Sequence, residues 1–357
     1  MRYLVISETG EALGIAHRLS TEGHHVNFLC TTSPSKGAGL VDVVRPPRPL
    51  LDRDGIFNRS SIDFILSTVI PDIIVIEGVG LTRVAKALLT RGLRVIGGGG
   101  TTAFANNPAP NYESEMTFIT WFNGNELVGP YSHVVCYDTP LSGNLGPKGL
   151  VSGVVAFCSS YKTKSFKALK FIEDQLKKTP YRGPIEVHIV GGSVVSVTYS
   201  FTSSLYPTLE AMRHPLSTHL LDIVNTTTTP SQPTIEPWVA GVSINMTPRT
   251  SNILGINDIN LRHIAVNDID KRDGVIWAMN DGRLGMVTAR GSSIREATKR
   301  VYRTINKMEI PGVVYRNDIG QDTGKLLNLF KNVLTNTEDG ATLNGSPVLQ
   351  PKEELPC

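Results

Sequence analysis

Apolar positions in the N-terminal part of the chain follow two different spacings. Short apolar runs predict strands at residues 3–6, 26–30, 72–76 and 93–96, and apolar residues three and four apart predict helices at 11–22, 60–69 and 81–91. The run at 72–76 is almost continuously apolar, which is typical of a strand buried on both faces. Strands that alternate with helices indicate a parallel sheet, so residues 1–99 are expected to form a doubly wound α/β domain.

The pattern changes to longer strands and hairpins after residue 116. The segments VVCYD, VSGVVAFC, PIEVHIV and SVVSVTYSF are expected to be strands of one mixed sheet, and Asn123-Gly124 predicts a hairpin turn. Helices are expected at 165–178 and 209–224, the second with a break near Pro215. Residues 116–225 are therefore interpreted as a central α+β domain. The Gly-, Asn-, Pro- and Thr-rich stretches 100–115 and 226–237 are interpreted as linkers.

A small C-terminal α+β domain is expected at residues 238–332. Within it, Asp281-Gly282 is a turn dipeptide, residues 284–289 predict a strand, and Ser292 or Ser293 can begin a helix with Glu296 completing a capping box. Helical spacing then continues through Ile294, Ala297, Thr298, Val301 and Ile305. The tail, residues 333–357, lacks periodicity and is expected to be disordered.

Composition excludes few classes of protein. Apolar residues make up 40% of the 357 residues and charged residues 19%, an ordinary globular mixture, and the formal charge is only +3. The four cysteines are scattered without a C-x-x-C pair, and no apolar stretch approaches the about 18 residues of a membrane span. We expect a cytoplasmic protein with reduced thiols and no membrane partner. Because no run is rich in Lys and Arg, nucleic-acid binding is allowed but not indicated.

The segment 281–320 resembles the C-terminal domain of phosphoribosylamine–glycine ligase, the glycinamide ribonucleotide synthetase of purine synthesis. The likeness is carried by Gly282-Arg283, Val287-Thr288-Ala289, Gly291, Glu296-Ala297, Tyr302 and the closing YRNDIG of residues 315–320. Residues 71–97 and the ESEMTFITWFNGNELV segment that begins at residue 113 are also similar to this family. The resemblance implies an ATP-grasp architecture and a site for glycine and a phosphorylated ribosylamine.

Two departures from the family affect its nucleotide site. The family's long insert, which forms one jaw of the ATP-grasp, has no room between Gly97 and residue 113. The positions of its magnesium ligands fall on Val197 and Tyr199, and that of a substrate-contacting arginine falls on Phe201. Since Mg²⁺ requires oxygen ligands, the resemblance implies a truncated ATP-grasp that binds neither MgATP nor another cofactor or metal.

Candidate site residues come from several segments. Asn144, Gly146, Lys148 and Gly149 lie in a loop that the family uses near its phosphoribosyl substrate, and backbone N–H groups there can bind phosphate; a plain surface loop is the alternative. Glu186 and His188 are two apart on a predicted strand, so both side chains share a face. They can act as a carboxylate-oriented general base, or belong to a solvated outer face.

Further candidates follow from matching positions. Arg316 and Asp318 can line the cleft or form a structural ion pair. The others stand at the carboxyl ends of predicted strands or in a hydroxyl-rich segment: Gly10, Glu11, Glu77, Gly78, Tyr199 and Ser203. The family's R-E-H residues are replaced at Glu11, Ala12 and Leu13, and Glu77 precedes the family's acidic position by two residues. We expect residues 7–10, 77–80 and 144–149 to share one pocket.

Three functions remain open from the sequence. The first is an ATP-independent transferase that joins a glycine-like amino acid or amine to a phosphate-activated nucleotide or nucleic-acid acceptor. The second is a non-catalytic binding or assembly protein that keeps the fold without the chemistry. The third is an ordinary ATP-dependent phosphoribosylamine–glycine ligase. The oligomeric state is not indicated by any motif.

Overall fold

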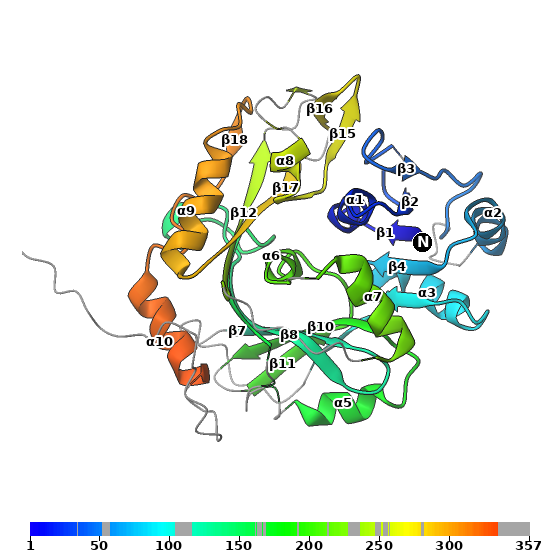
Figure 1. Ribbon diagram of the computed structural model, residues 1–357, viewed down its shortest axis with the longest axis horizontal. Coiled ribbons are helices and arrows are strands. Elements are labelled where there is room, and N and C mark those ends of the chain that lie inside the picture. Colours follow the sequence, from blue (N-terminus) through cyan, green and yellow to red (C-terminus); the bar gives the residue numbers. More distant parts are fainter. Residues whose placement is uncertain are drawn as a thin grey trace, which may run out of the picture.

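The computed structural model combines a parallel sheet with a larger antiparallel sheet and a small third one (Figure 1). It describes residues 1–33, 35–51, 58–103, 116–160, 162, 166, 169–190, 193–212, 214–227, 236–246, 251–252, 256, 258–279 and 282–334. The expected tail therefore lies, except for residues 333 and 334, outside the described residues, as do most of the two expected linkers.

The N-terminal sheet has the strand order β3-β2-β1-β4-β5, with all pairs parallel. Its strands are β1 (Arg2–Ser7), β2 (His25–Cys30), β3 (Asp42–Val43), β4 (Ile73–Glu77) and β5 (Val95–Gly97). Helices α1 (Leu13–Thr21), α2 (Arg59–Val69) and α3 (Thr82–Leu89) connect them, with the 3₁₀ turn η1 (Val79–Leu81) before α3.

Alternate residues of one strand explain why this domain is doubly wound. Tyr3 and Val5 of β1 belong to one hydrophobic cluster, whereas Leu4 and Ile6 belong to another on the opposite face. Because side chains alternate across a strand, both faces of the sheet must be covered, which the connecting helices achieve. The doubly wound α/β domain expected from the sequence is confirmed.

The second sheet runs through the rest of the molecule in the order β14-β17-β12-β9-β8-β7-β10-β11-β6, with β18 also on β12. A mixed sheet was expected, but every pair among its described strands is antiparallel. The strands are β6 (Thr101–Ala103), β7 (Met116–Phe122), β8 (Leu127–Tyr137), β9 (Gly153–Ser159), β10 (Gly183–Val190), β11 (Ser193–Thr198), β12 (Trp238–Met246), β14 (Ile264–Val266), β17 (Arg283–Gly291) and β18 (Val313–Val314).

Pairing of β9 with β12 joins strands that we had assigned to two domains. The segment 226–237 therefore connects parts of one continuous sheet. A second difference is β6, a short strand inside the stretch interpreted as a linker, which pairs with β11. The third sheet is formed by β13 (Ser251–Asn252), β15 (Ile269–Arg272) and β16 (Val275–Ala278), with α8 (Asp258–Leu261) nearby in the chain.

The helices of the larger part agree only in part with the expected positions, because nothing in the sequence predicted one at 142–144 or 323–334 and the helix expected from residue 165 is described at 170–176. They are η3 (Ser142–Asn144), α5 (Lys170–Leu176), α6 (Leu205–Glu210), α7 (Leu216–Asn225), α9 (Ile294–Ile305) and α10 (Thr323–Leu334). The capping box of α9 is confirmed, because Glu296 N donates to Ser293 Oγ at 3.2 Å and Ser292 N donates to Glu296 Oε2 at 2.9 Å. Within the described residues, no helix combines the length and apolar character that crossing a bilayer requires.

Candidate functional site

A cavity of about 510 Å³ with polar and apolar lining residues lies between β8, β10 and the start of α10. It brings together four of the residues singled out from the sequence, namely Asn144, Lys148, Glu186 and His188. Glu186 and His188 reach it from the same face of β10, whereas Ile185 and Val187 are buried on the opposite face. The cavity therefore contains a carboxylate, an imidazole, an ammonium group and a carboxamide from two separate segments.

Hydroxyl groups position the carboxylate of Glu186. Thr202 and Ser204 both donate to Glu186 Oε2, the second at 2.7 Å. Both donors stand in the segment that leads into α6. Two hydrogen bonds to one oxygen hold the carboxylate in a single orientation.

The imidazole of His188 lies two residues further along the same strand. Its Nδ1 is 3.4 Å from Thr117 Oγ1 on the neighbouring strand β7, in register with His188. A hydroxyl at this distance can select the ring nitrogen that carries the proton. We expected Glu186 to orient His188, but the described partners of Glu186 are the hydroxyls of Thr202 and Ser204.

Positive charge enters the cavity from two sides. Lys148 Nζ lies 3.0 Å from Asp138 Oδ2, and each of these side chains is partly exposed. Lys325 and Asp322 line the cavity from the α10 side. No motif indicates Asp138, Asp322 or Lys325, and of the three only Asp138 stands at the end of a predicted strand.

Arg316 fixes the loop that carries Asn144. Its side chain is buried, with Nε and Nη2 donating to the two oxygens of Asp318 at 2.8 and 2.7 Å, and Nη1 donating to Thr139 Oγ1 and Asn144 Oδ1 at 2.8 and 3.0 Å. The guanidinium also lies over the ring of Tyr137. Since every one of these partners belongs to the protein and Arg316 does not line the cavity, its described contacts are those of a structural ion pair.

Asp318 completes this fixation. Burial raises its pKa, but hydrogen bonds from Arg316 and from the backbone N–H of Gly143 outweigh burial, so the pKa lies below its ordinary value. The carboxylate therefore stays ionised over the physiological range and continues to hold the loop.

The two glycines of the loop have different roles in its backbone. Gly149 donates its N–H to the carbonyl of Asp138 at 2.9 Å, which favours the plain-loop alternative for this residue. A Cβ on Gly149 would meet nothing within 4 Å. Gly146 is different, because its φ is +95° and a Cβ would stand 2.9 Å from Pro140 Cγ. Gly146 thus serves the turn itself.

A second polar cluster stands at the carboxyl ends of β1 and β4, where the strand order of the parallel sheet reverses. Glu77 is buried there, with the hydroxyls of Ser7 and Thr9 donating to its carboxylate. Burial raises the pKa of Glu77 to about 7, against the lowering effect of the Ser7 hydrogen bond. Glu8 accepts from Gly80 N at 2.9 Å, so the loops after the two strands lie together as expected.

The remaining residues of this cluster contact other parts of the protein. Gly10 N donates to Ser7 Oγ at 2.8 Å, and Gly78 N donates to Ser200 Oγ at 3.1 Å. Glu11 forms an ion pair with Arg283 on β17. Within the described lining of the Glu186 cavity, no residue comes from 7–10 or 77–80. The pocket expected to be shared with residues 144–149 is therefore divided, and the segment 200–204 lies between its two parts.

Residues at the family's metal-binding and substrate positions pack into the protein. Val197 is fully buried, Tyr199 packs edge-on against Tyr181 with ring centroids 5.6 Å apart, and Phe201 packs edge-on against Trp121. Ser203 is partly buried and does not line the cavity. Among the residues that the structure describes, no group of three or more His, Cys, Asp or Glu side chains could hold a metal ion.

Comparisons with known proteins give structural likeness but no sequence match. No model of a protein family matches the chain, and no curated protein matches it. The phosphoribosylamine–glycine ligase of Thermotoga maritima is similar with a TM-score of 0.60, 16% identity, 89% of this chain covered and 100% of that one. The biotin carboxylase domain of a single-chain bacterial carboxylase is similar with a TM-score of 0.58 and 11% identity. The match covers 94% of this chain and 100% of that one.

The N5-carboxyaminoimidazole ribonucleotide synthetase of Thermotoga maritima is a third similar structure, with a TM-score of 0.53, 11% identity, and 88% and 100% of the two chains covered. Identities this low carry the fold and not the activity. The chain therefore has the ATP-grasp-like fold shared by these structures.

Proposed function

We propose that this chain is an ATP-independent transferase that joins a glycine-like amino acid or amine to a phosphate-activated nucleotide or nucleic-acid acceptor. The observation that carries the proposal is the cavity in which Glu186, His188 and Lys148 converge. A carboxylate suits the ammonium group of an amino acid, an imidazole can accept its proton, and an ammonium group suits a departing phosphate. The family likeness of the fold, in which glycine is joined to a phosphorylated amine, is compatible with these ligands.

The reaction needs no oxidant or metal. His188 accepts a proton from the bound ammonium group, and the freed amine nitrogen attacks the acceptor carbon that bears the phosphate ester. The C–N bond forms as the C–O bond breaks, and the phosphate or pyrophosphate leaves with the electron pair. Lys148 stabilises the developing negative charge, and Glu186 holds the amine in position. Holding two reactants together can contribute several kcal/mol, about 7 or more in well-oriented cases.

Two features support the loss of MgATP from this chemistry. Val197, Tyr199 and Phe201 occupy the family's ligand positions with side chains that pack against other residues. Only residues 104–115 separate β6 from β7, where the family's jaw would be inserted. Phosphoryl transfer depends on magnesium ions that neutralise the phosphates. Neither the packed side chains nor the short segment provides an oxygen ligand for a magnesium ion.

A non-catalytic binding protein is the second candidate, and a specific observation favours it. Backbone N–H groups of Gly10, Gly78 and Gly149 all donate to the protein itself. A fold that has closed its ligand-binding loops in this way can persist as an assembly partner.

A thermal-shift panel separates the candidates. Glycine, inorganic pyrophosphate, nucleoside monophosphates and MgATP are each added to the full chain, with EDTA in all wells except those with MgATP. Stabilisation by glycine and pyrophosphate supports the transferase, and stabilisation by MgATP alone supports an ordinary ligase. No shift with any ligand leaves the non-catalytic candidate and contradicts the transferase.

A further inference from the structure

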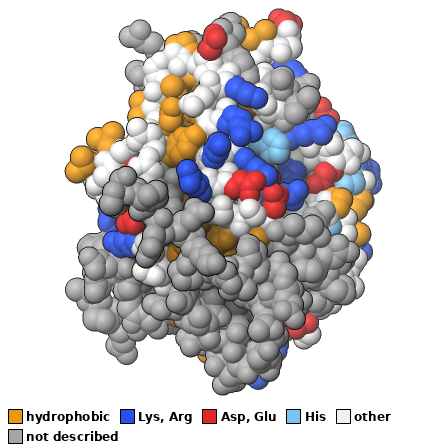
Figure 2. Space-filling model, turned by 60° about the vertical axis from the view of Figure 1, so that its left-hand side comes forward, with side chains coloured by type: hydrophobic (Ala, Val, Ile, Leu, Met, Phe, Trp, Pro, Cys, Tyr) orange, Lys and Arg blue, Asp and Glu red, His pale blue; other side chains and the backbone are white. Residues whose placement is uncertain are grey.

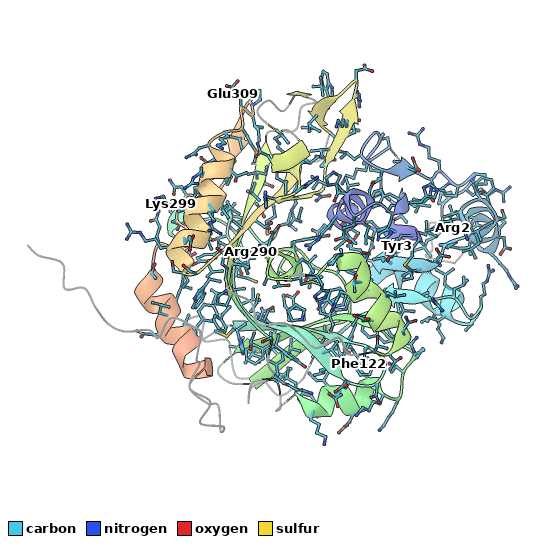
Figure 3. The ribbon with its side chains drawn as sticks, in the orientation of Figure 1. Arg2, Tyr3, Phe122, Arg290, Lys299 and Glu309 are labelled. Carbon is cyan, nitrogen blue, oxygen red and sulfur yellow. The ribbon has the colours of Figure 1, made fainter. Side chains whose placement is uncertain are left out.

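The outer face of α9 carries a row of cations. Arg295, Lys299 and Arg303 are spaced four residues apart and are all exposed, and Lys307 continues the row in the turn after the helix. With a rise of about 1.5 Å per residue, cations four apart lie about 6 Å from each other along the axis. Figure 3 shows Lys299 directed away from the body of the molecule.

These four side chains have no counter-charge among the residues that the structure describes. Within the described residues, no ion pair or side-chain hydrogen bond is formed by any of them, whereas the nearby Arg300 is paired with Glu236 and Glu296. Residues 290–307 contain six Lys or Arg and one Glu, although the whole chain carries only +3. Figure 2, which brings this side of the molecule forward, shows Lys and Arg side chains gathered together with Asp, Glu and His side chains.

The buried face of α9 argues against a membrane surface as the ligand of this row. Ile294, Ala297, Val301 and Ile305 are buried against the sheet, so no apolar side chain of the helix remains to enter a membrane. Interfacial helices bind lipid by burying such an apolar face, and here that face is already occupied. A linear row of cations that form no ion pair within the described part of the chain instead matches a linear polyanion in solution.

A groove lies beside this row, on the side of the segment that borders the Glu186 cavity. It has a volume of about 680 Å³ and is lined by Arg295 and Lys299 on one side and by Gln321 and Thr323 on the other. Asp322, between these last two residues, lines the Glu186 cavity. A ligand chain held on α9 is therefore separated from the cavity by a single segment of the protein.

We propose that α9 binds the sugar–phosphate backbone of a nucleic-acid strand, through Arg295, Lys299, Arg303 and Lys307. The inference deepens the proposed function, on which it rests for the role of the bound strand as acceptor. Phosphate contacts of this kind position a strand without reading its sequence, so binding is expected to be independent of sequence and sensitive to salt.

The test is the fluorescence anisotropy of a labelled single-stranded oligonucleotide titrated with the full chain at several NaCl concentrations. The triple variant Arg295→Gln, Lys299→Gln, Arg303→Gln is compared with a control of equal charge change, Arg59→Gln, Lys86→Gln, Arg94→Gln, whose exposed positions lie on the N-terminal domain. Three lost phosphate contacts should reduce the slope of log K against log salt by about 2, with at least about a tenfold loss of affinity at low salt. The control should keep the wild-type slope.

Three outcomes would overturn the inference: equal losses in the two triple variants, no oligonucleotide binding by the wild-type chain at low salt, or binding to phosphatidylserine vesicles but not to oligonucleotides. Urea unfolding of both variants excludes a folding defect as the cause. Because no amino acid or transfer is involved, the result is independent of the proposed function. If the chain binds the oligonucleotide but glycine does not stabilise it, only the transferase proposal is contradicted. If glycine stabilises the chain but the oligonucleotide does not bind, only the role of α9 is contradicted.

Discussion

The hydroxyl of Ser204 donates a hydrogen bond of 2.7 Å to the carboxylate of Glu186, and so ties the segment before α6 to strand β10. Thr202 donates to the same oxygen. On the other side of this segment, Ser200 accepts the N–H of Gly78 from the parallel sheet. Residues 200–204 therefore connect the Glu77 cluster with the Glu186 cavity. They also orient the carboxylate of Glu186, which we propose binds the amine of the substrate.

Replacing Glu186 with Gln should separate binding from stability. The carboxamide oxygen can still accept from Thr202 and Ser204, so the free energy of unfolding should change by less than about 1 kcal/mol. Loss of the negative charge should weaken glycine binding at least tenfold, about 1.4 kcal/mol. Calorimetric titration with glycine and urea unfolding measure the two effects. Glu309→Gln, at an exposed position, is the control; equal glycine affinities in both variants would remove Glu186 from the site.

Replacing Lys148 with Gln should weaken the binding of inorganic pyrophosphate about tenfold or more, because a charge-assisted contact to a phosphate oxygen is lost. Stability should hardly change, since the ion pair with Asp138 is partly exposed and such pairs contribute about 1 kcal/mol or less. Lys86→Gln has the same change of charge on α3 and should leave pyrophosphate affinity unchanged. A similar weakening in both variants would show a general charge effect.

Replacing Arg316 with Ala should destabilise the fold by about 3–5 kcal/mol, because the buried guanidinium joins Asp318, Thr139 and Asn144. Arg316→Lys should recover only part of this, since an ammonium group cannot form the two parallel bonds to Asp318. Urea unfolding provides the free energies. A loss below about 1 kcal/mol for the Ala variant would show that the loop holding Asn144 is fixed by other contacts.

Glu77 should make stability depend on pH. Its pKa is raised to about 7 in the folded chain, so between the ordinary glutamate pKa and 7 the folded state binds more protons than the unfolded state. The free energy of unfolding should therefore fall as pH rises from about 4.5 to 7. Glu77→Gln should remove this fall and be the more stable protein at pH 8, by up to about 3 kcal/mol. Urea unfolding from pH 4.5 to 8.5 measures it, and parallel curves for the two proteins would contradict the assignment.

Local signals in the sequence were sufficient for the parts of the fold that depend on neighbouring residues. The capping box at Ser293 and Glu296 and the continuous apolar run of β4 both have local physical causes, and both are present. The joining of β9 to β12 has no local signal, because it depends on which strand edges meet after folding. The strand β6 also has no local signal, so the sequence predicts a linker there. Its three exposed residues form a strand only because they pair with β11.

The candidate site was predictable to a similar extent. Alternation along a strand placed Glu186 and His188 on one face, and the structure adds Lys148 and Asn144 to the same cavity. Composition did not indicate the row on α9, because its cations are separated by buried residues and converge only on a helix. Nor could glycine content show that Gly149 donates its N–H to Asp138, since that bond depends on the fold of the loop.

The most direct test is a calorimetric titration of glycine into the full chain under two conditions. The first buffer contains inorganic pyrophosphate and EDTA, and the second contains MgATP without pyrophosphate or EDTA. An ATP-independent transferase should bind glycine in EDTA, with one site per chain, and MgATP should bring no gain in affinity. Glycine binding only when MgATP is present, or no glycine binding in either buffer, would contradict the proposed function.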